Sequence, residues 1–151
     1  MPSYKYGGRQ FQIQSNLVTA STTANATVGV FNYLPAVLAN QAIDYAAETI
    51  KSATLVFVSS LASSATTGNS VIIAATQYNS AGSSVASAAL YNQGLASVAA
   101  LTPLDVSTKL NTWVLNPGDS VVLMVNTNTV GIPASFPNFT LSGTIDSVTA
   151  A

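Results

Sequence analysis

Apolar and polar residues alternate along short runs of this chain. Phe11 and Ile13 alternate with Gln12 and Gln14, which predicts a short strand with one face toward water. The same spacing recurs to the end of the chain, and further strands are predicted at 27–34, 53–59, 71–78, 120–126 and 139–148, with a weaker one at 85–95. The run 53–59 is apolar on both sides, which predicts a central strand.

Turn-forming residues separate these runs. Pro35 ends the run before it, because proline cannot donate a hydrogen bond to a sheet. Gly82 marks a turn over 79–84, and the clearest turn is Asn116-Pro117-Gly118-Asp119, where Asp119 is expected to be structural. The segment 41–50 has both helical and alternating spacing; we interpret it as a strand followed by a turn. About eight short strands without a secure helix predict an all-β fold, a single-domain sandwich or jelly-roll-like barrel.

The first ten residues differ from the rest. They contain two of the four basic residues of the chain and a pair of glycines, which make the backbone permissive. We therefore expect an extended N-terminal arm at 1–10 and a β-sandwich domain at 11–151. Because tyrosine and arginine are enriched at interaction hot spots, the candidate binding residues are those of the arm: Tyr4, Lys5, Tyr6, Gly7, Gly8, Arg9 and Gln10.

Charge is scarce. Charged residues make up 6% of the chain and the net charge is −1, against about 25% charged residues in an ordinary soluble domain. A small protein with so little charge tends to associate, so we expect partners to cover much of its surface. The chain has no run of ~18 apolar residues, which argues against a membrane partner. It also begins without the apolar core of a signal peptide, so we expect synthesis in a host cytoplasm.

The residue types needed for most catalysis and metal binding are missing. Histidine and cysteine are absent, which removes the commonest general base, the commonest metal ligand and the best nucleophile. The five acidic residues form no calcium-loop or phosphate-loop motif. Four basic residues are too few to neutralise the phosphates of a nucleic-acid site. We therefore expect no enzymatic activity, no metal, no cofactor and no nucleic-acid partner.

Aromatic residues leave one binding alternative open. Trp113, Tyr33, Tyr78 and Tyr91 are candidates for a platform on which sugars stack. Trp113 sits among apolar neighbours in the sequence, which favours core or interface packing for it instead.

Three segments resemble a family of viral proteins. They are the strand, proline break and strand of VGVFNYLPAVLANQAIDYAAETIKSAT (28–54), the turn and strand of LNPGDSVVLMVN (115–126), and the terminal strand FTLSGTIDSV (139–148). Together with the length, the low charge and the short arm, they resemble the head decoration, or cement, proteins of tailed bacteriophages. The resemblance covers most of the chain.

The resemblance implies a β-sandwich protein that binds the outer surface of the major capsid protein lattice as a trimer and stabilises the virion. It also implies that the N-terminal segment, here 2–10, reaches onto neighbouring capsid subunits. Two alternatives stay open: another virion β-module, such as a spike, fibre tip or jelly-roll coat protein, and a non-catalytic glycan-binding or adhesion module.

Overall fold

The computed structural model describes residues 9–15, 27–35, 47–61, 71–92, 98–116, 118–127 and 136–147. Within these ranges the chain forms nine strands and one short helix. In chain order they are β1 (Arg9–Gln14), β2 (Thr27–Pro35), β3 (Glu48–Phe57), β4 (Val71–Tyr78), β5 (Ser84–Asn92), β6 (Leu104–Asp105), α1 (Ser107–Leu110), β7 (Val114–Leu115), β8 (Ser120–Thr127) and β9 (Phe139–Ser147).

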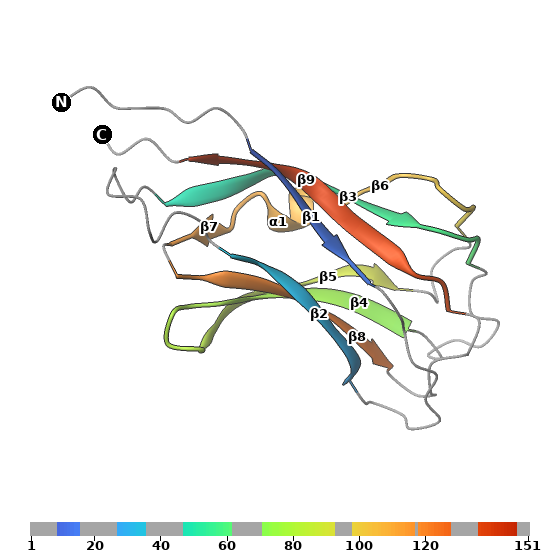
Figure 1. Cartoon of the computed structure of the whole chain (residues 1–151), viewed down its shortest axis with the longest axis horizontal. Coiled ribbons are helices and arrows are strands. Elements are labelled where there is room, and N and C mark those ends of the chain that lie inside the picture. Colours follow the sequence, from blue (N-terminus) through green and yellow to red (C-terminus); the bar gives the residue numbers. More distant parts are fainter. Residues whose placement is uncertain are drawn as a thin grey trace.

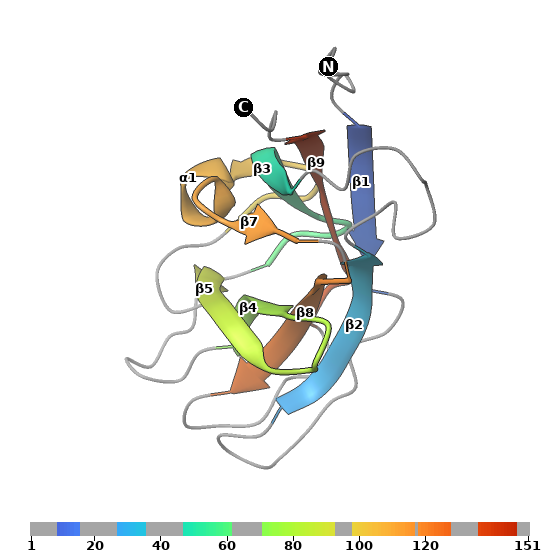
Figure 2. The same cartoon turned by 90° about the vertical axis from the view of Figure 1, so that its left-hand side faces the viewer.

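The strands form two antiparallel sheets that lie one above the other (Figure 1). One sheet has the order β1-β9-β3-β6, and β7 also pairs with β3. The other has the order β2-β8-β4-β5. Figure 2, turned by a quarter, shows the two layers from the side, with α1 next to β7 at one margin of the five-stranded sheet.

The order of the strands is that of a jelly roll. β6 pairs with Thr54 and Leu55 of β3, and β7 pairs with Glu48 and Thr49 nearer the start of the same strand. β6 and β7 are thus two parts of one strand that α1 interrupts. Counted so, the nine strands become eight, four in each sheet, and the chain crosses between sheets after every strand except β4. This arrangement of two interlocked Greek keys confirms the predicted all-β sandwich.

β3 differs from its prediction in length. Instead of a strand at 53–59, a single strand runs from Glu48 to Phe57 and pairs with β9 over most of its length. Lys51 is exposed in the middle of it, at a shift of register between Ile50 and Ser52. A bulge of this kind turns one polar side chain outward without ending the strand. The predicted central position of this strand is confirmed, while residues 41–46 lie outside the described ranges.

The other strong predictions match the structure closely. β2, β4, β8 and β9 begin and end within one residue of the predicted runs. β1 begins at Arg9, so residues 9 and 10 belong to the sandwich and the expected arm of 1–10 is two residues too long. The predicted boundary is wrong because Arg9 and Gln10 carry no apolar side chain, although both pair with β9.

The core lies between the two sheets. Phe57 is fully buried there, and its ring makes edge contacts with Tyr91, Phe136 and Phe139 at centroid distances of 5.1, 6.1 and 6.1 Å. Such aromatic contacts add to the stabilisation from burial. Other large, fully buried side chains come from both sheets: Ile50, Leu55, Ile73, Leu110, Leu115, Leu123 and Leu141.

The first and last strands are fastened together by Ser15. Its hydroxyl accepts a hydrogen bond from the Phe139 amide at 2.7 Å and lies 3.1 Å from the Phe139 carbonyl oxygen. The amide of Ser15 donates to the same carbonyl at 2.9 Å. Because Ser15 is buried, these bonds satisfy groups that water cannot reach.

Candidate functional site

The predicted binding residues lie only partly within the described ranges. Tyr4, Lys5, Tyr6, Gly7 and Gly8 fall outside them. Arg9 is the first residue of β1 and pairs with Ile145. Gln10 is exposed and lies opposite Thr144 of β9. The predicted arm therefore leads directly into the edge strand of the five-stranded sheet.

Part of the outer side of this sheet carries rows of neutral, mostly polar side chains, which we call the polar face; the exposed residues Lys51 and Asp105 lie beside these rows, Asp105 opposite Thr54. The inward side chains of β1 and β9 are buried, so the residues between them point outward. The register places three side chains in each of three rows across the strands β1, β9 and β3. The rows are Gln10, Thr144 and Ser52; Gln12, Ser142 and Thr54; and Gln14, Thr140 and Val56.

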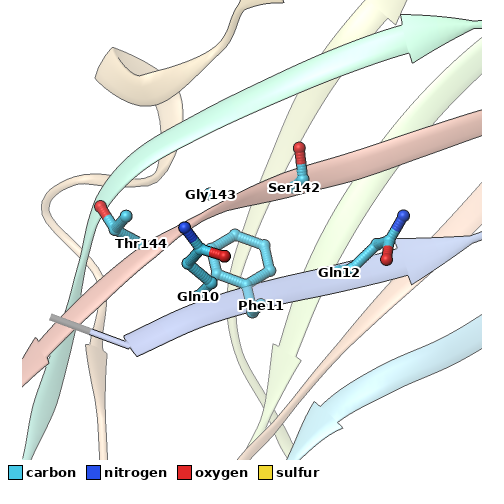
Figure 3. A pocket seen from close by; sticks show the side chains of 6 residues that line it. All are labelled: Gln10, Phe11, Gln12, Ser142, Gly143 and Thr144. Atoms are coloured by element: carbon cyan, nitrogen blue, oxygen red, sulfur yellow. The ribbon is translucent and has the colours of Figure 1, made fainter.

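A shallow hollow with a volume of about 530 Å³ lies on the polar face. Figure 3 shows Gln10, Phe11 and Gln12 of β1 beside Ser142, Gly143 and Thr144 of β9, which line it. The Thr144 hydroxyl is hydrogen-bonded to that of Ser52 at 2.8 Å. Amides and hydroxyls both donate and accept, so this surface can bind main-chain and neutral polar groups of a partner.

Gly143 allows β3 to approach β9 closely. A Cβ atom at this position would overlap the carbonyl oxygen of Ser52 and lie 2.9 Å from Cε1 of Phe11. Only glycine therefore allows β3 and β9 to lie side by side at the bulge of β3. By the alternation along β9, Gly143 lies on the same side of the sheet as the buried residues Leu141 and Ile145.

The outer side of the four-stranded sheet has a different chemistry, and we call it the apolar face. The buried residues of β8 are Val121, Leu123 and Val125, so the half-buried residues between them point outward. The same alternation holds along β4. The apolar face is defined by Ile72 and Ala74 of β4, Ala89 of β5, and Val122 and Met124 of β8, with Thr76, Tyr78, Ser87, Ser120 and Asn126 around them.

Charged residues are divided unequally between the two sheets. β2, β4, β5 and β8 contain none. Within the described ranges, all but one belong to the five-stranded sheet or to α1: Arg9, Glu48, Lys51, Asp105, Lys109 and Asp146. The remaining one, Asp119, is buried in the turn before β8. The sandwich thus has one sheet that carries charge and one that carries none.

A network of buried polar groups holds that turn. The amide nitrogen of Gln77 donates to the Asp119 carboxylate and to the Val114 carbonyl, both at 2.8 Å. The backbone amide of Asn116 donates to the same carboxylate oxygen at 2.9 Å. Gly118, in the same turn, has a φ of +88°. The structural role predicted for Asp119 is confirmed, because its carboxylate closes the turn and joins it to β4.

A second hollow, of about 580 Å³, lies beside this network. Exposed Val85 and Val114 border it, and Trp113 forms part of its wall. Only 7% of Trp113 is exposed, so the residue belongs to the core, as its apolar neighbours in the sequence predicted. The side chain of Tyr33, another candidate for sugar stacking, lies outside what the structure describes.

The acidic residues do not gather. Glu48 and Asp119 are buried, while Asp105 is exposed at the end of β6, and Asp44 lies outside the described ranges. The side chain and the amide of Ser107 both hydrogen-bond to the Asp105 carboxylate and lower its pKa. No group of three or more acidic residues able to hold a metal occurs in the described part of the chain. Among the same residues, no helix is long and apolar enough to cross a membrane.

Comparison with known proteins adds little. The sequence matches no protein-family model and no curated protein. Solved structures that resemble the fold are those of infectious bursal disease virus, the Gx strain (TM-score 0.43, 13% identity) and the Gt strain (TM-score 0.41, 11% identity). Each alignment covers 97% of this chain and 38% of the viral one, so this chain spans well under half of that length. Both are structures of a virus, but a likeness this weak supports no inference about function.

The two faces were not recognised as sites in the sequence. Six of the predicted strands lack any charged residue, so the scarcity of charge along the chain does not single out one sheet. The charge-free sheet is evident only from the strand pairing.

Proposed function

We propose that this chain is a non-enzymatic structural protein of a virion, which decorates and stabilises a bacteriophage capsid as a homotrimer on its outer surface. The observation that carries the proposal is the pair of unlike outer faces on a rigid jelly roll. One face offers neutral hydrogen-bonding groups and the other offers apolar area. A subunit with two such faces is suited to contact a lattice on one side and its own kind on another.

Attachment to the major capsid protein is proposed to involve the arm and the polar face together. Residues Tyr4 to Gly8 lead into β1, whose outward residues Gln10 and Gln12 begin two rows of the polar face. Their contacts would be hydrogen bonds between neutral groups, which salt does not screen. Attachment should therefore persist at high ionic strength.

The test is binding of the recombinant protein to purified empty capsids of the virus that encodes it, measured by co-sedimentation. Deleting residues 2–8 keeps β1 intact and should weaken binding more than tenfold, which is about 1.4 kcal/mol. Ser142→Arg, in the middle row of the polar face, should also weaken it. Thr108→Arg, exposed on α1 and outside both outer faces, is the matched control and should bind capsids as the wild type does. Wild-type occupancy by both the truncated protein and Ser142→Arg would refute this mode of attachment.

A glycan-binding or adhesion module is the second candidate. The hollow beside Gln77 and Asp119 favours it, because amide, carboxylate and indole groups together are typical of sugar sites. The amide hydrogens of Gln77 are already used within the protein, however. Binding to immobilised glycans that Asn79→Ala abolishes, with no binding to capsids, would favour this alternative.

A further inference from the structure

The apolar face is the feature whose chemistry points to a particular partner. Its central strands, β8 and β4, present Val122, Met124, Ile72 and Ala74 outward, and none of these side chains is fully buried. Ala89 and Ser87 of β5 are exposed beside them. An apolar sheet surface next to water is typical of an interaction site in a soluble protein.

We infer that this face binds a second copy of the same chain, with the apolar faces of the copies turned toward a common symmetry axis. This inference rests on the proposed function, since it assigns the surface through which the proposed oligomer forms. Near a symmetry axis each residue approaches its own counterpart, so any charged residue there meets a like charge. Like charges placed opposite one another destabilise a contact.

The distribution of charge fits this requirement. The three strands that build the face, β4, β5 and β8, contain no acidic or basic residue, and neither does β2 in the same sheet, although the opposite sheet contains several. A capsid subunit would impose no such restriction, because charges on one protein can be matched by opposite charges on another. The absence of charge from a whole sheet therefore favours a copy of the chain over a different protein.

The shape of the face fits as well. Alanine side chains at 74 and 89 face each other across β4 and β5, so the centre of the surface has little relief. The hydroxyls of Thr76 and Ser87 share one hydrogen bond, with their oxygens 3.4 Å apart. Met124 adds a flexible side chain that adapts to an apposed surface. Sheets with such faces pack closely on one another.

The test is the oligomeric state of charge variants, measured by sedimentation velocity and native mass spectrometry. Ala74→Glu places a carboxylate at the centre of the apolar face, between Met124 and Ala89. Ser142→Glu is the matched control, since it lies in the middle of the other sheet between Gln12 and Thr54. Ala74→Glu should raise the dissociation constant of the oligomer about a hundredfold or more, since like-charge contacts cost several kcal/mol. Ser142→Glu should leave it unchanged.

Ala89→Glu keeps the test decisive if Ala74→Glu fails to fold, because residue 89 is exposed and tolerates a larger side chain. Folding is checked for each variant by circular dichroism and by the urea midpoint. A monomeric wild-type protein, a folded variant on the apolar face that stays oligomeric, or an equal loss in Ser142→Glu would each overturn the inference. Capsid binding separates the two proposals: an oligomer that binds no capsids refutes capsid decoration alone, and a wild-type monomer that decorates capsids refutes this inference and the homotrimer while leaving capsid decoration standing.

Discussion

Replacing Gly143 with alanine tests whether the close approach of β3 and β9 holds the five-stranded sheet together. The added Cβ would overlap the backbone carbonyl oxygen of Ser52 and stand 2.9 Å from Cε1 of Phe11. The phenylalanine ring can move, but the carbonyl belongs to the β3–β9 ladder at its bulge. Relief therefore requires the two strands to separate locally.

The magnitude follows from these two contacts. Inserting one carbon into a packed interior typically lowers the free energy of unfolding by about 1–3 kcal/mol. Because the obstructing atom here belongs to the backbone and cannot rotate away, we expect a loss of about 3 kcal/mol at this site. Alanine restricts the unfolded chain more than glycine does, which returns about 0.4–1 kcal/mol. The net loss expected for Gly143→Ala is therefore about 2–3 kcal/mol, a large part of the 5–15 kcal/mol that holds a typical domain.

Urea unfolding followed by tryptophan fluorescence measures this loss, because Trp113 is the single tryptophan and is buried. All variants are compared at one protein concentration, since association would shift the midpoint. Gly82→Ala is the control: Gly82 has a φ of +82° but nothing within 4 Å of the added Cβ, so only about 1–2 kcal/mol of backbone strain applies. Adding Phe11→Leu should not restore Gly143→Ala, because the carbonyl remains.

A Gly143→Ala protein whose free energy of unfolding lies within about 1 kcal/mol of the wild-type value would refute this reasoning. Full recovery of wild-type stability on adding Phe11→Leu would refute it too. The first result would mean that β3 and β9 can separate at little cost. The second would mean that the ring alone excludes a side chain.

Two further predictions concern single side chains. Ser15→Ala should cost about 1–3 kcal/mol in urea unfolding, because it leaves the Phe139 amide without its 2.7 Å acceptor, whereas Ser59→Ala on the surface should change nothing measurable. Asp105→Ala should lower the melting temperature at neutral pH but not near about pH 2. Hydrogen bonds from Ser107 lower the pKa of the Asp105 carboxyl below its usual 3.8. The carboxylate therefore stabilises the fold above pH 3.8, and this stabilisation is lost as the pH falls through the pKa of the folded state. An equal difference at both pH values would contradict the second prediction.

The sequence was sufficient for the strands with a clear alternation, because burial of one face requires apolar residues at every second position. It was insufficient for β6, β7 and α1, since segments of two to four residues are too short to show a period. β3 was predicted too short at its start because Lys51 looks like a boundary, whereas a bulge turns its side chain outward within the strand.

The candidate surfaces were harder to predict than the strands. The neutral character of β4, β5 and β8 is evident along the chain, but their assembly into one sheet depends on pairing between distant segments. Only Gln10 and the backbone of Arg9 link the arm predicted from tyrosine, glycine and arginine to the polar face. The role of Tyr4 to Gly8 stays a prediction.

The pairing of β1 with β9 determines when the sheet can be completed during synthesis. Ser15 and Phe139, which fasten the two strands, lie 124 residues apart. At about 5–20 residues per second, a ribosome needs roughly 6–25 s to make the chain between them. During that interval β1 has no partner strand, and its alternating glutamine and apolar residues are open to wrong pairing. Slower translation should therefore reduce the soluble yield, whereas the finished sandwich should unfold slowly once both ends have joined.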